Sequence, residues 1–181
     1  ISSGKTYKKI KKLGFKSIEI SNFTGSNEML GGRVKTLHPK IHAGILNVRN
    51  NKHHKLDLIK NNFKEIDLII VNFYPFENAI KKNNSFKNII ENIDIGGPTL
   101  VRAAAKNFGD VLVVTSPKNY INMIDEINKN KGSTSLNFRK QMAINAFNEI
   151  ANYDSIIANY FNDKFDVNFP NKKTLTGKLI E

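Results

Sequence analysis

The run IDLIIVNFYP at residues 66–75 restricts the fold of this chain more than any other feature of its sequence. Its apolar residues follow one another without polar alternation, which predicts a strand buried on both faces, as in a parallel sheet. A similar run at residues 111–116 predicts a second buried strand. Asn72 and Tyr74 come at the carboxyl end of the first strand, where α/β proteins bind ligands, although these residues taken alone favour a turn with a packed tyrosine.

The stretch NIDIGGPTLVRAAAKN at residues 92–107 predicts a tight turn that opens a helix near Gly97, with Pro98 at its first position. Unpaired backbone N–H groups and a partial positive charge at a helix start favour an electron-rich ligand. Because Gly96 and Gly97 lack Cβ atoms, such a ligand can approach their backbone closely.

Charged side chains flank the same helix. Asp94 lies just before the turn, and Arg102 and Lys106 are four residues apart on one helix face. A sharp connection and a packed helix with a solvated edge would give the same pattern, so this stretch alone does not decide between a site and a structural turn.

Two further loops carry groups that suit a phosphate. Residues 1–6 form a strand end and a loop with hydroxyl and backbone N–H groups, and a second loop places two cations and a hydroxyl directly after Gly31 and Gly32. The residues concerned are Ser3, Gly4 and Thr6 in the first loop and Arg33, Lys35 and Thr36 in the second.

The rest of the pattern is mainly helical. We expect helices at residues 7–13, 56–61, 76–92, 117–130 and 136–161, a short strand at 16–21 with a loop after it at 22–27, and a polar linker from 163 onward. The long helix at 136–161 has an apolar stripe predicted to face the core, made of Met142, Ala143, Ala146, Phe147, Ile150 and Ala151.

Composition excludes several kinds of site. The chain has no cysteine, which rules out disulfides, thiolate metal sites and a cysteine nucleophile. His38 and His42 have the spacing of a metal-binding pair on a helix, but no glutamate follows His38 and no third ligand is evident, so structural histidines are expected and no metal. No apolar run is long enough to span a bilayer and no signal segment is present, so we expect no membrane partner and a cytoplasmic location.

The net charge of +12 favours an anionic partner, such as a nucleotide, a phosphate ester or a nucleic acid. The lysines are scattered along the chain, which argues against nucleic acid. A nucleic-acid binder would need them clustered on one surface and would lose affinity steeply with salt.

Four segments together resemble the inosine monophosphate cyclohydrolase domain of the bifunctional purine biosynthesis proteins, whose other half is a transformylase. They are EMLGGRVKTLHPKIHAGIL at 28–46, NFYPF at 72–76, NIDIGGPTLVRAAAKN at 92–107 and YDSIIANYF at 153–161. Lys5 departs from the family pattern by replacing a glycine of a Ser-Gly-Gly-Thr motif. Ser26-Asn27 and Phe73 also stand where that family often has other residues.

The resemblance implies a methylglyoxal synthase-like α/β fold of three layers, a mostly parallel sheet flanked by helices. It implies a cyclohydrolase domain at residues 1–165 that lacks the family's first strand and its Ser-Asp-Lys loop. Residues 166–181 would be a linker towards a transformylase domain that this chain does not include. The full-length protein would be a homodimer.

The resemblance also implies a reaction, the dehydrative ring closure of 5-formamidoimidazole-4-carboxamide ribotide (FAICAR) to inosine monophosphate, without a cofactor. The implied catalytic residues are Lys35, Tyr74, Asp94 and Lys106. The implied substrate-binding residues are Ser3, Gly4, Thr6, Arg33, Thr36, Asn72, Ile95, Gly96 and Gly97. A regulatory nucleotide-binding module of the same fold is the alternative, and it would keep the phosphate contacts without the catalytic set.

Overall fold

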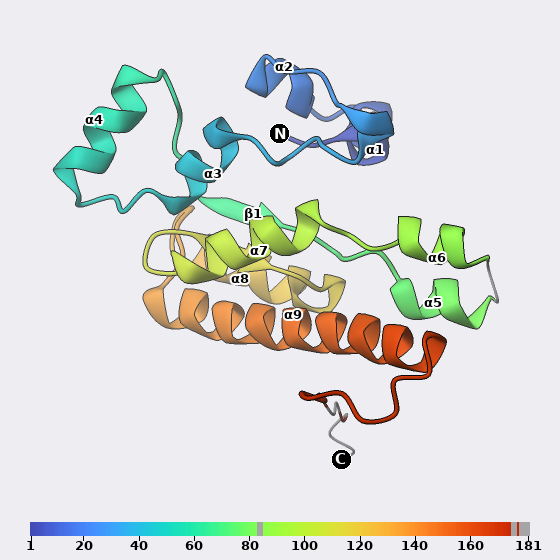
Figure 1. Cartoon of the computed structure of the whole chain (residues 1–181). Helices are drawn as coiled ribbons and strands as arrows, with labels where there is room; N and C mark the ends of the chain where they lie inside the picture. Colours follow the sequence, from blue (N-terminus) through green and yellow to red (C-terminus); the bar gives the residue numbers. More distant parts are fainter. Residues whose placement is uncertain (83–84, 175–176, 178–181) are drawn as a thin grey trace.

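The computed structural model describes residues 1–82, 85–174 and 177. Figure 1 shows the chain arranged with the long helix α9 along one side and the amino-terminal helices on the other. The helices are α1 (Gly4–Lys12), α2 (Ile20–Thr24), α3 (Pro39–Leu46), α4 (Lys52–Lys60), α5 (Phe76–Lys81), α6 (Phe86–Glu91), α7 (Gly96–Lys106), α8 (Tyr120–Lys129) and α9 (Leu136–Lys164), with short 3₁₀ turns at Leu30–Gly32 and Pro117–Asn119.

The predicted parallel sheet is present. Strand β1 (Leu68–Ile70) pairs in parallel with β2 (Leu112–Val114), with Ile69 opposite Val113. All three residues of β2 are buried, as predicted. The prediction of burial on both faces is wrong for β1, where Ile70 is 44% exposed. Among the described residues β2 is its one strand neighbour, so β1 is a sheet edge and the Ile70 side is left uncovered.

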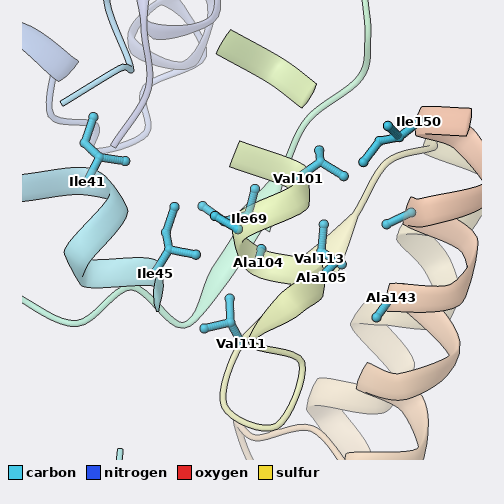
Figure 2. Close-up of a cluster of buried hydrophobic side chains, with 12 residues drawn as sticks. Ile41, Ile45, Ile69, Val101, Ala104, Ala105, Val111, Val113, Ala143 and Ile150 are labelled. Carbon is cyan, nitrogen blue, oxygen red and sulfur yellow. The ribbon is translucent and has the colours of Figure 1, made fainter. Parts of the chain in front are cut away.

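Helix α7 lies at the centre of the core. It packs against α9, α3 and both strands. Val101 and Ala104 of α7 are fully buried together with Ile45 of α3 and Ala146 of α9 (Figure 2). Because alanine side chains are short, the α7 backbone can approach its neighbours closely, which fixes the place of the turn at its start.

The other side of β2 faces α8 and α9. Leu112 and Val114 pack with Met123 of α8 and Met142 of α9. This second cluster sandwiches β2 between helices, which confirms the α/β arrangement with helices on both sides of a parallel sheet.

The region at residues 16–27 differs from the prediction of a strand and a loop. Only Glu19 makes a strand-like bridge, to Ser2, and α2 begins at the next residue. Gly25, with φ of 74°, ends α2 as a left-handed cap whose N–H donates to Ser21 O. The Thr24 hydroxyl also donates to Ile20 O. These local bonds close a helical turn where the alternation of Ile18 and Ile20 predicted an extended chain.

Other predicted boundaries shift modestly. The helix expected at 56–61 begins at Lys52, because Asn51 accepts the N–H groups of His53 and His54 as a cap. The helix expected at 76–92 is described as α5 and α6, and residues 83–84 lie outside the described part. Pro98 is the third residue of α7 rather than its first, a position whose N–H has no intrahelical acceptor in any case.

Helix α9 runs to Lys164, beyond the predicted end at 161 and into the expected linker. Met142, Ala143, Ala146 and Ile150 are buried as predicted, but Phe147 is 42% exposed and Ala151 is also exposed. The buried residues recur at helical spacings of three and four, and each exposed one directly follows a buried one, about 100° further around the helix. The end of the expected linker lies outside the described residues, apart from 177. No helix in the described part is long and apolar enough to cross a membrane.

Candidate active site

Asp94 lies in the turn that leads into α7 and is held from two sides. Its carboxylate Oδ1 accepts the Gly97 N–H at 2.8 Å, and its own backbone N–H donates to the Tyr153 hydroxyl at 2.7 Å. Burial raises the pKa of the Asp94 carboxyl, and hydrogen bonds from the backbone of Gly97 and Gly96 oppose that rise. The result is a carboxylate of increased basicity at a helix start.

The two glycines of this turn leave room for their neighbours. A methyl group on Gly97 would collide with Asp94 Oδ2 and would lie 3.1 Å from Val71 Cγ1. One on Gly96 would lie 2.6 Å from Thr36 Oγ1. Asp94, Thr36 and the carboxyl end of β1 therefore meet at the start of α7, and the absence of both Cβ atoms makes this possible.

Lys35 extends from the glycine-rich loop towards the start of α1. Its ammonium pairs with Glu28 Oε2 at 2.8 Å, and a methyl group on Gly4 would lie 3.8 Å from its Nζ. Its side chain lies over Gly32, whose φ of 94° suits glycine. The helix start and the ammonium are both positive, so an anion placed between them would be stabilised by both.

Ser3 caps α1 in an extended conformation without a side-chain hydrogen bond to the helix, which leaves its hydroxyl able to bind a ligand. Thr6 lies in the first turn and is exposed. The loop of Ser3 and Gly4, the loop of Lys35 and Thr36 and the start of α7 are thus joined through the contacts of Gly4 and Gly96.

Arg33 is on the same loop as Lys35 but points elsewhere. Its guanidinium makes a two-pronged ion pair with Glu91 at the end of α6. This hydrogen-bonded pairing raises the pKa of Arg33 and lowers the pKa of Glu91. Both loop cations therefore have carboxylate partners, and a phosphate would replace one carboxylate with another anion.

Asn72 and Tyr74 follow β1. The Asn72 amide donates to the Tyr120 hydroxyl at 2.8 Å, which ties this loop to α8. Tyr74 is 58% exposed and lines a hollow of about 200 Å³ together with Phe73 and Tyr153. Burial raises the pKa of the Tyr153 phenol, and Tyr74 and Asp94 are both close enough to raise it further through their charges.

Lys106 is not beside Asp94. It is exposed in the last turn of α7, while Asp94 precedes the first, and ten residues of helix separate Lys106 from Gly96 by about 15 Å. Arg102 is also exposed, one turn before Lys106.

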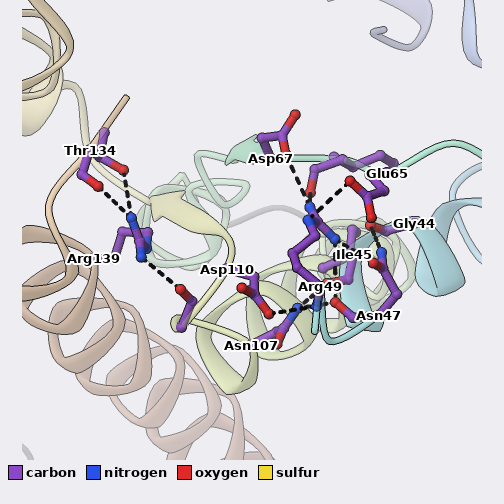
Figure 3. Close-up of polar contacts among 12 residues, drawn as sticks. Gly44, Ile45, Asn47, Arg49, Glu65, Asp67, Asn107, Asp110, Thr134 and Arg139 are labelled. Carbon is purple, nitrogen blue, oxygen red and sulfur yellow. Dashed lines mark hydrogen bonds and ion pairs between the residues drawn. The ribbon is translucent and has the colours of Figure 1, made fainter. Parts of the chain in front are cut away.

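The neighbouring residue Asn107 belongs to a polar network at that far end of α7. Its amide donates to Ile45 O and Asn47 O, both at 2.8 Å. Arg49 there donates to Asn47 Oδ1 and Asp67 Oδ1 (Figure 3). These bonds hold the loop after α3 against α7 and the start of β1.

Three residues at the site carried no role in the sequence prediction: Glu28, Glu91 and Tyr153. Glu28 and Glu91 are exposed glutamates without a local pattern that would mark them. Tyr153 lies within the motif YDSIIANYF, three residues after Ile150 of the predicted apolar stripe. A tyrosine that is buried on a helix needs a partner for its hydroxyl, and this is the signal that could have found it.

His38 and His42 both make local contacts at the start of α3. His38 caps α3, with its Nδ1 accepting the Lys40 N–H at 3.1 Å, and His42 Nδ1 lies 3.2 Å from His38 O. Within the described part of the chain, no group of three or more potential ligands could hold a metal ion.

Two family models match this chain along most of its length. The MGS-like domain matches residues 1–99, and the AICARFT/IMPCHase bienzyme matches residues 104–180. The second model begins within α7, so the boundary between the two runs through the helix that starts at the site.

Curated relatives are similar over nearly the whole chain. The bifunctional purine biosynthesis protein PurH of Bradyrhizobium diazoefficiens is 45% identical over 100% of this chain and 34% of its own length. PurH of Clostridium acetobutylicum is 50% identical over 88% of this chain and 32% of its own. PurH of Persephonella marina is 46% identical over 94% of this chain and 33% of its own length. This chain thus spans about a third of the length of these relatives.

A solved structure, described as the crystal structure of ForH, has a similar fold. It superposes with a TM-score of 0.75 at 28% identity, covering 88% of this chain and 83% of its own.

Proposed function

This chain belongs to the AICARFT/IMPCHase bienzyme family and carries its MGS-like domain, and from that membership we propose that it closes the ring of FAICAR to give inosine monophosphate. The observation that carries the proposal is the half-buried Asp94 carboxylate at the start of α7, next to Thr36 and to the loop of Lys35. This arrangement offers a base, a cation and hydroxyl groups around one anionic ligand.

The reaction needs positioning and proton transfers. The carboxamide nitrogen forms a bond to the formyl carbon and gives up one proton, the formyl oxygen becomes a hydroxyl, and the formamide nitrogen gives up a second proton as that oxygen leaves as water. Because the reacting groups belong to one molecule, holding the reactive rotamer supplies much of the acceleration.

Asp94 is the base for the carboxamide proton. An amide nitrogen is a poor nucleophile until it begins to lose a proton, and a carboxylate with a raised pKa accepts that proton more readily than an ordinary aspartate. The hydrogen bond from Gly97 to Oδ1 orients the carboxylate and leaves Oδ2 to face the substrate.

Stabilisation of the formyl oxygen falls to Lys35. We expected Lys35, Lys106 and the backbone N–H groups at residues 95–97 to do this together, but in the structure the Gly97 N–H donates to Asp94 itself and Lys106 is at the far end of α7. The start of α7 therefore holds the base, and the ammonium of Lys35 is the closest cation to the converging loops.

The 5′-phosphate binds at the start of α1. Ser3, Gly4 and Thr6 offer hydroxyl and backbone N–H groups there, and Thr36 and Arg33 complete the set on the neighbouring loop. Arg33 would have to leave Glu91 to reach the phosphate.

The remaining predicted residues have less direct positions. Tyr74 is exposed at the hollow beside Tyr153, where it can relay a proton, and Asn72 supports the loop that carries it through its bond to Tyr120. Lys106 lies at the far end of α7, so its effect on turnover is expected to be smaller than that of Asp94.

Turnover of FAICAR by the whole chain, followed by ultraviolet absorbance, tests the proposal. We expect the parent chain to form inosine monophosphate and Asp94→Asn to lower kcat by about 10²- to 10⁴-fold, the usual contribution of a general base. Asp154→Asn, an exposed aspartate on α9, is the matched control and should keep parental turnover.

The outcomes separate the two candidate functions. A parent that binds inosine monophosphate in a calorimetric titration but forms none would contradict the enzyme and favour the regulatory module. Equal turnover by the parent and Asp94→Asn would remove Asp94 from the mechanism.

A further inference from the structure

Tyr153 connects the turn before α7 with the loop after β1. It is 6% exposed on α9, 59 residues after Asp94, yet its hydroxyl accepts the Asp94 N–H at 2.7 Å. The same hydroxyl donates to Asn92 O at 3.4 Å. One phenol group thus hydrogen-bonds to the turn before α7 at two backbone positions.

The ring of Tyr153 contacts the loop after β1. Its centroid lies 5.1 Å from that of Phe73 and 6.4 Å from that of Phe76. Phe73 stands between Asn72 and Tyr74, so packing of this ring sets the position of both neighbours. Rings packed this closely have few alternative rotamers, and a ring held in this way carries its hydroxyl to a fixed point.

We propose that Tyr153 is a positioning residue that holds the base Asp94 and the loop of Tyr74 in fixed positions relative to each other. The inference rests on the ring closure proposed above. In the described part of the chain, the hydrogen bonds and ring contacts of Tyr153 are with the turn before α7, the loop after β1 and the start of α5. It therefore acts on the alignment of the reacting groups and has little part in holding the substrate.

The state of the phenol suits this role. Burial raises the pKa of the Tyr153 hydroxyl, so it remains protonated at neutral pH and can donate to Asn92 O while it accepts from Asp94 N–H. An ionised phenolate would lose the donated bond and would repel the carboxylate of Asp94.

Tyr153→Phe removes the hydroxyl and keeps the ring. We expect kcat for FAICAR to fall about five- to ten-fold, the effect of one lost positioning hydrogen bond, with KM within two-fold of the parent. The matched control is Tyr160→Phe. Tyr160 lies two turns further along α9 in the same aromatic cluster, against Phe76 and Phe86, and should keep parental kcat.

A double-mutant cycle tests whether Tyr153 acts through Asp94. In an Asp94→Asn background, Tyr153→Phe should lower kcat less than two-fold further, because the base that it positions is already gone. A general loss of folding would instead lower activity equally in both backgrounds.

The results distinguish the inference from the function on which it rests. A parent chain without turnover would overturn both. A fully active parent whose Tyr153→Phe variant matches Tyr160→Phe, or loses activity equally in the Asp94→Asn background, would overturn the positioning role alone. Exchange of the Asp94 amide hydrogen, followed by NMR, should be faster in Tyr153→Phe than in Tyr160→Phe, and equal rates would also contradict the inference.

Discussion

Asp94 shows how one residue receives opposing influences from its surroundings. Burial disfavours its charge and the Gly97 N–H favours it, and burial is the larger effect, since the pKa is raised. A carboxylate that is neither fully stabilised nor fully hydrated is suited to accept a proton. The free-energy cost of keeping this charge partly buried lowers the stability of the fold.

That cost predicts a pH-dependent gain in stability for Asp94→Asn. Because the folded state binds the Asp94 proton more tightly than the unfolded state, stability falls as pH rises from the ordinary aspartate pKa, roughly 3.9, through the raised folded value. At pH values above both pKa values of Asp94, the fold bears the full cost of the ionised carboxylate. Asparagine keeps an oxygen for the Gly97 N–H and carries no charge.

We therefore expect Asp94→Asn to have a higher melting temperature than the parent at pH 7 and an equal one near pH 3.5. Thermal unfolding at both pH values, followed by circular dichroism, measures this. A difference of the same size at both pH values would show that ionisation of Asp94 is not its cause.

Gly97 is predicted to tolerate no side chain. In Gly97→Ala the added methyl group would collide with the Asp94 carboxylate and crowd Val71, so the carboxylate must leave its place. We expect a loss of kcat of about 10²-fold or more, similar to a lost base, with a destabilisation of about 1–3 kcal/mol from overpacking. Gly109→Ala is the control, because nothing lies within 4 Å of a methyl group there. Parental kcat in Gly97→Ala would refute the close approach.

Glu91 is predicted to compete with the substrate phosphate for Arg33. Glu91→Gln weakens the ion pair that holds Arg33 away, so KM for FAICAR should fall about two- to five-fold, as expected from loss of an exposed pair. Asp163→Asn changes the net charge equally at an exposed position on α9 and is the control. The same fall in KM in both variants would indicate a general charge effect, and a rise in Glu91→Gln would contradict the competition.

Helix α7 has different surroundings at its two ends. Its first turn meets Asp94 and Thr36, while its last turn leads into Asn107 and the polar network with Asn47 and Arg49. The fully buried residues Val101 and Ala104 lie between the two ends and hold the helix against α9. A helix anchored at both ends and along its length keeps the site turn in place.

The network at the far end is predicted to contribute to stability without a direct role in catalysis. Asn107→Ala removes two hydrogen bonds to backbone carbonyls, which should cost about 1–3 kcal/mol of unfolding free energy in a urea titration. Asn61→Ala removes one exposed bond at the end of α4 and should cost less than about 0.5 kcal/mol. Similar losses in the two variants would mean that the network adds nothing beyond a surface bond.

The whole molecule carries a large excess of positive charge. The chain has 28 lysines and arginines against 16 aspartates and glutamates, a net charge of +12. Within the described residues the ion pairs involve Arg33, Lys35 and Arg49 as cations. The other described cations are exposed or partly exposed, and like charges at a surface repel one another.

Salt should therefore stabilise the chain. Between 0.01 M and 0.15 M NaCl the screening length falls from roughly 30 Å to about 8 Å. We expect the melting temperature to rise by about 2–4 °C, which corresponds to about 1 kcal/mol for a chain of this length. Scanning calorimetry in NaCl and in sodium acetate measures the effect and distinguishes it from binding of chloride, and a melting temperature that falls with salt would contradict self-repulsion.

Features controlled by neighbouring residues were predictable. The helix start at Gly96-Gly97-Pro98, the buried strand β2 and the long helix α9 follow from local patterns, and the structure has all three. The separation of Lys106 from Asp94 also follows from the sequence once α7 is assigned, because the rise of a helix is constant. Local patterns were insufficient at residues 16–21, where short-range hydrogen bonds such as that from Gly25 N–H to Ser21 O favoured α2 over a strand.

The sequence by itself determined the two strands, the helices α7 and α9 and the polar residues that follow β1, because these depend on backbone sterics and on the period of apolar side chains. Only the tertiary structure decided that Tyr153 holds Asp94, that Glu91 pairs with Arg33, and that Ile70 is exposed. Each of these depends on segments brought together by packing around α7, and the contact of two residues 58 or 59 positions apart has no signature in either one's local sequence.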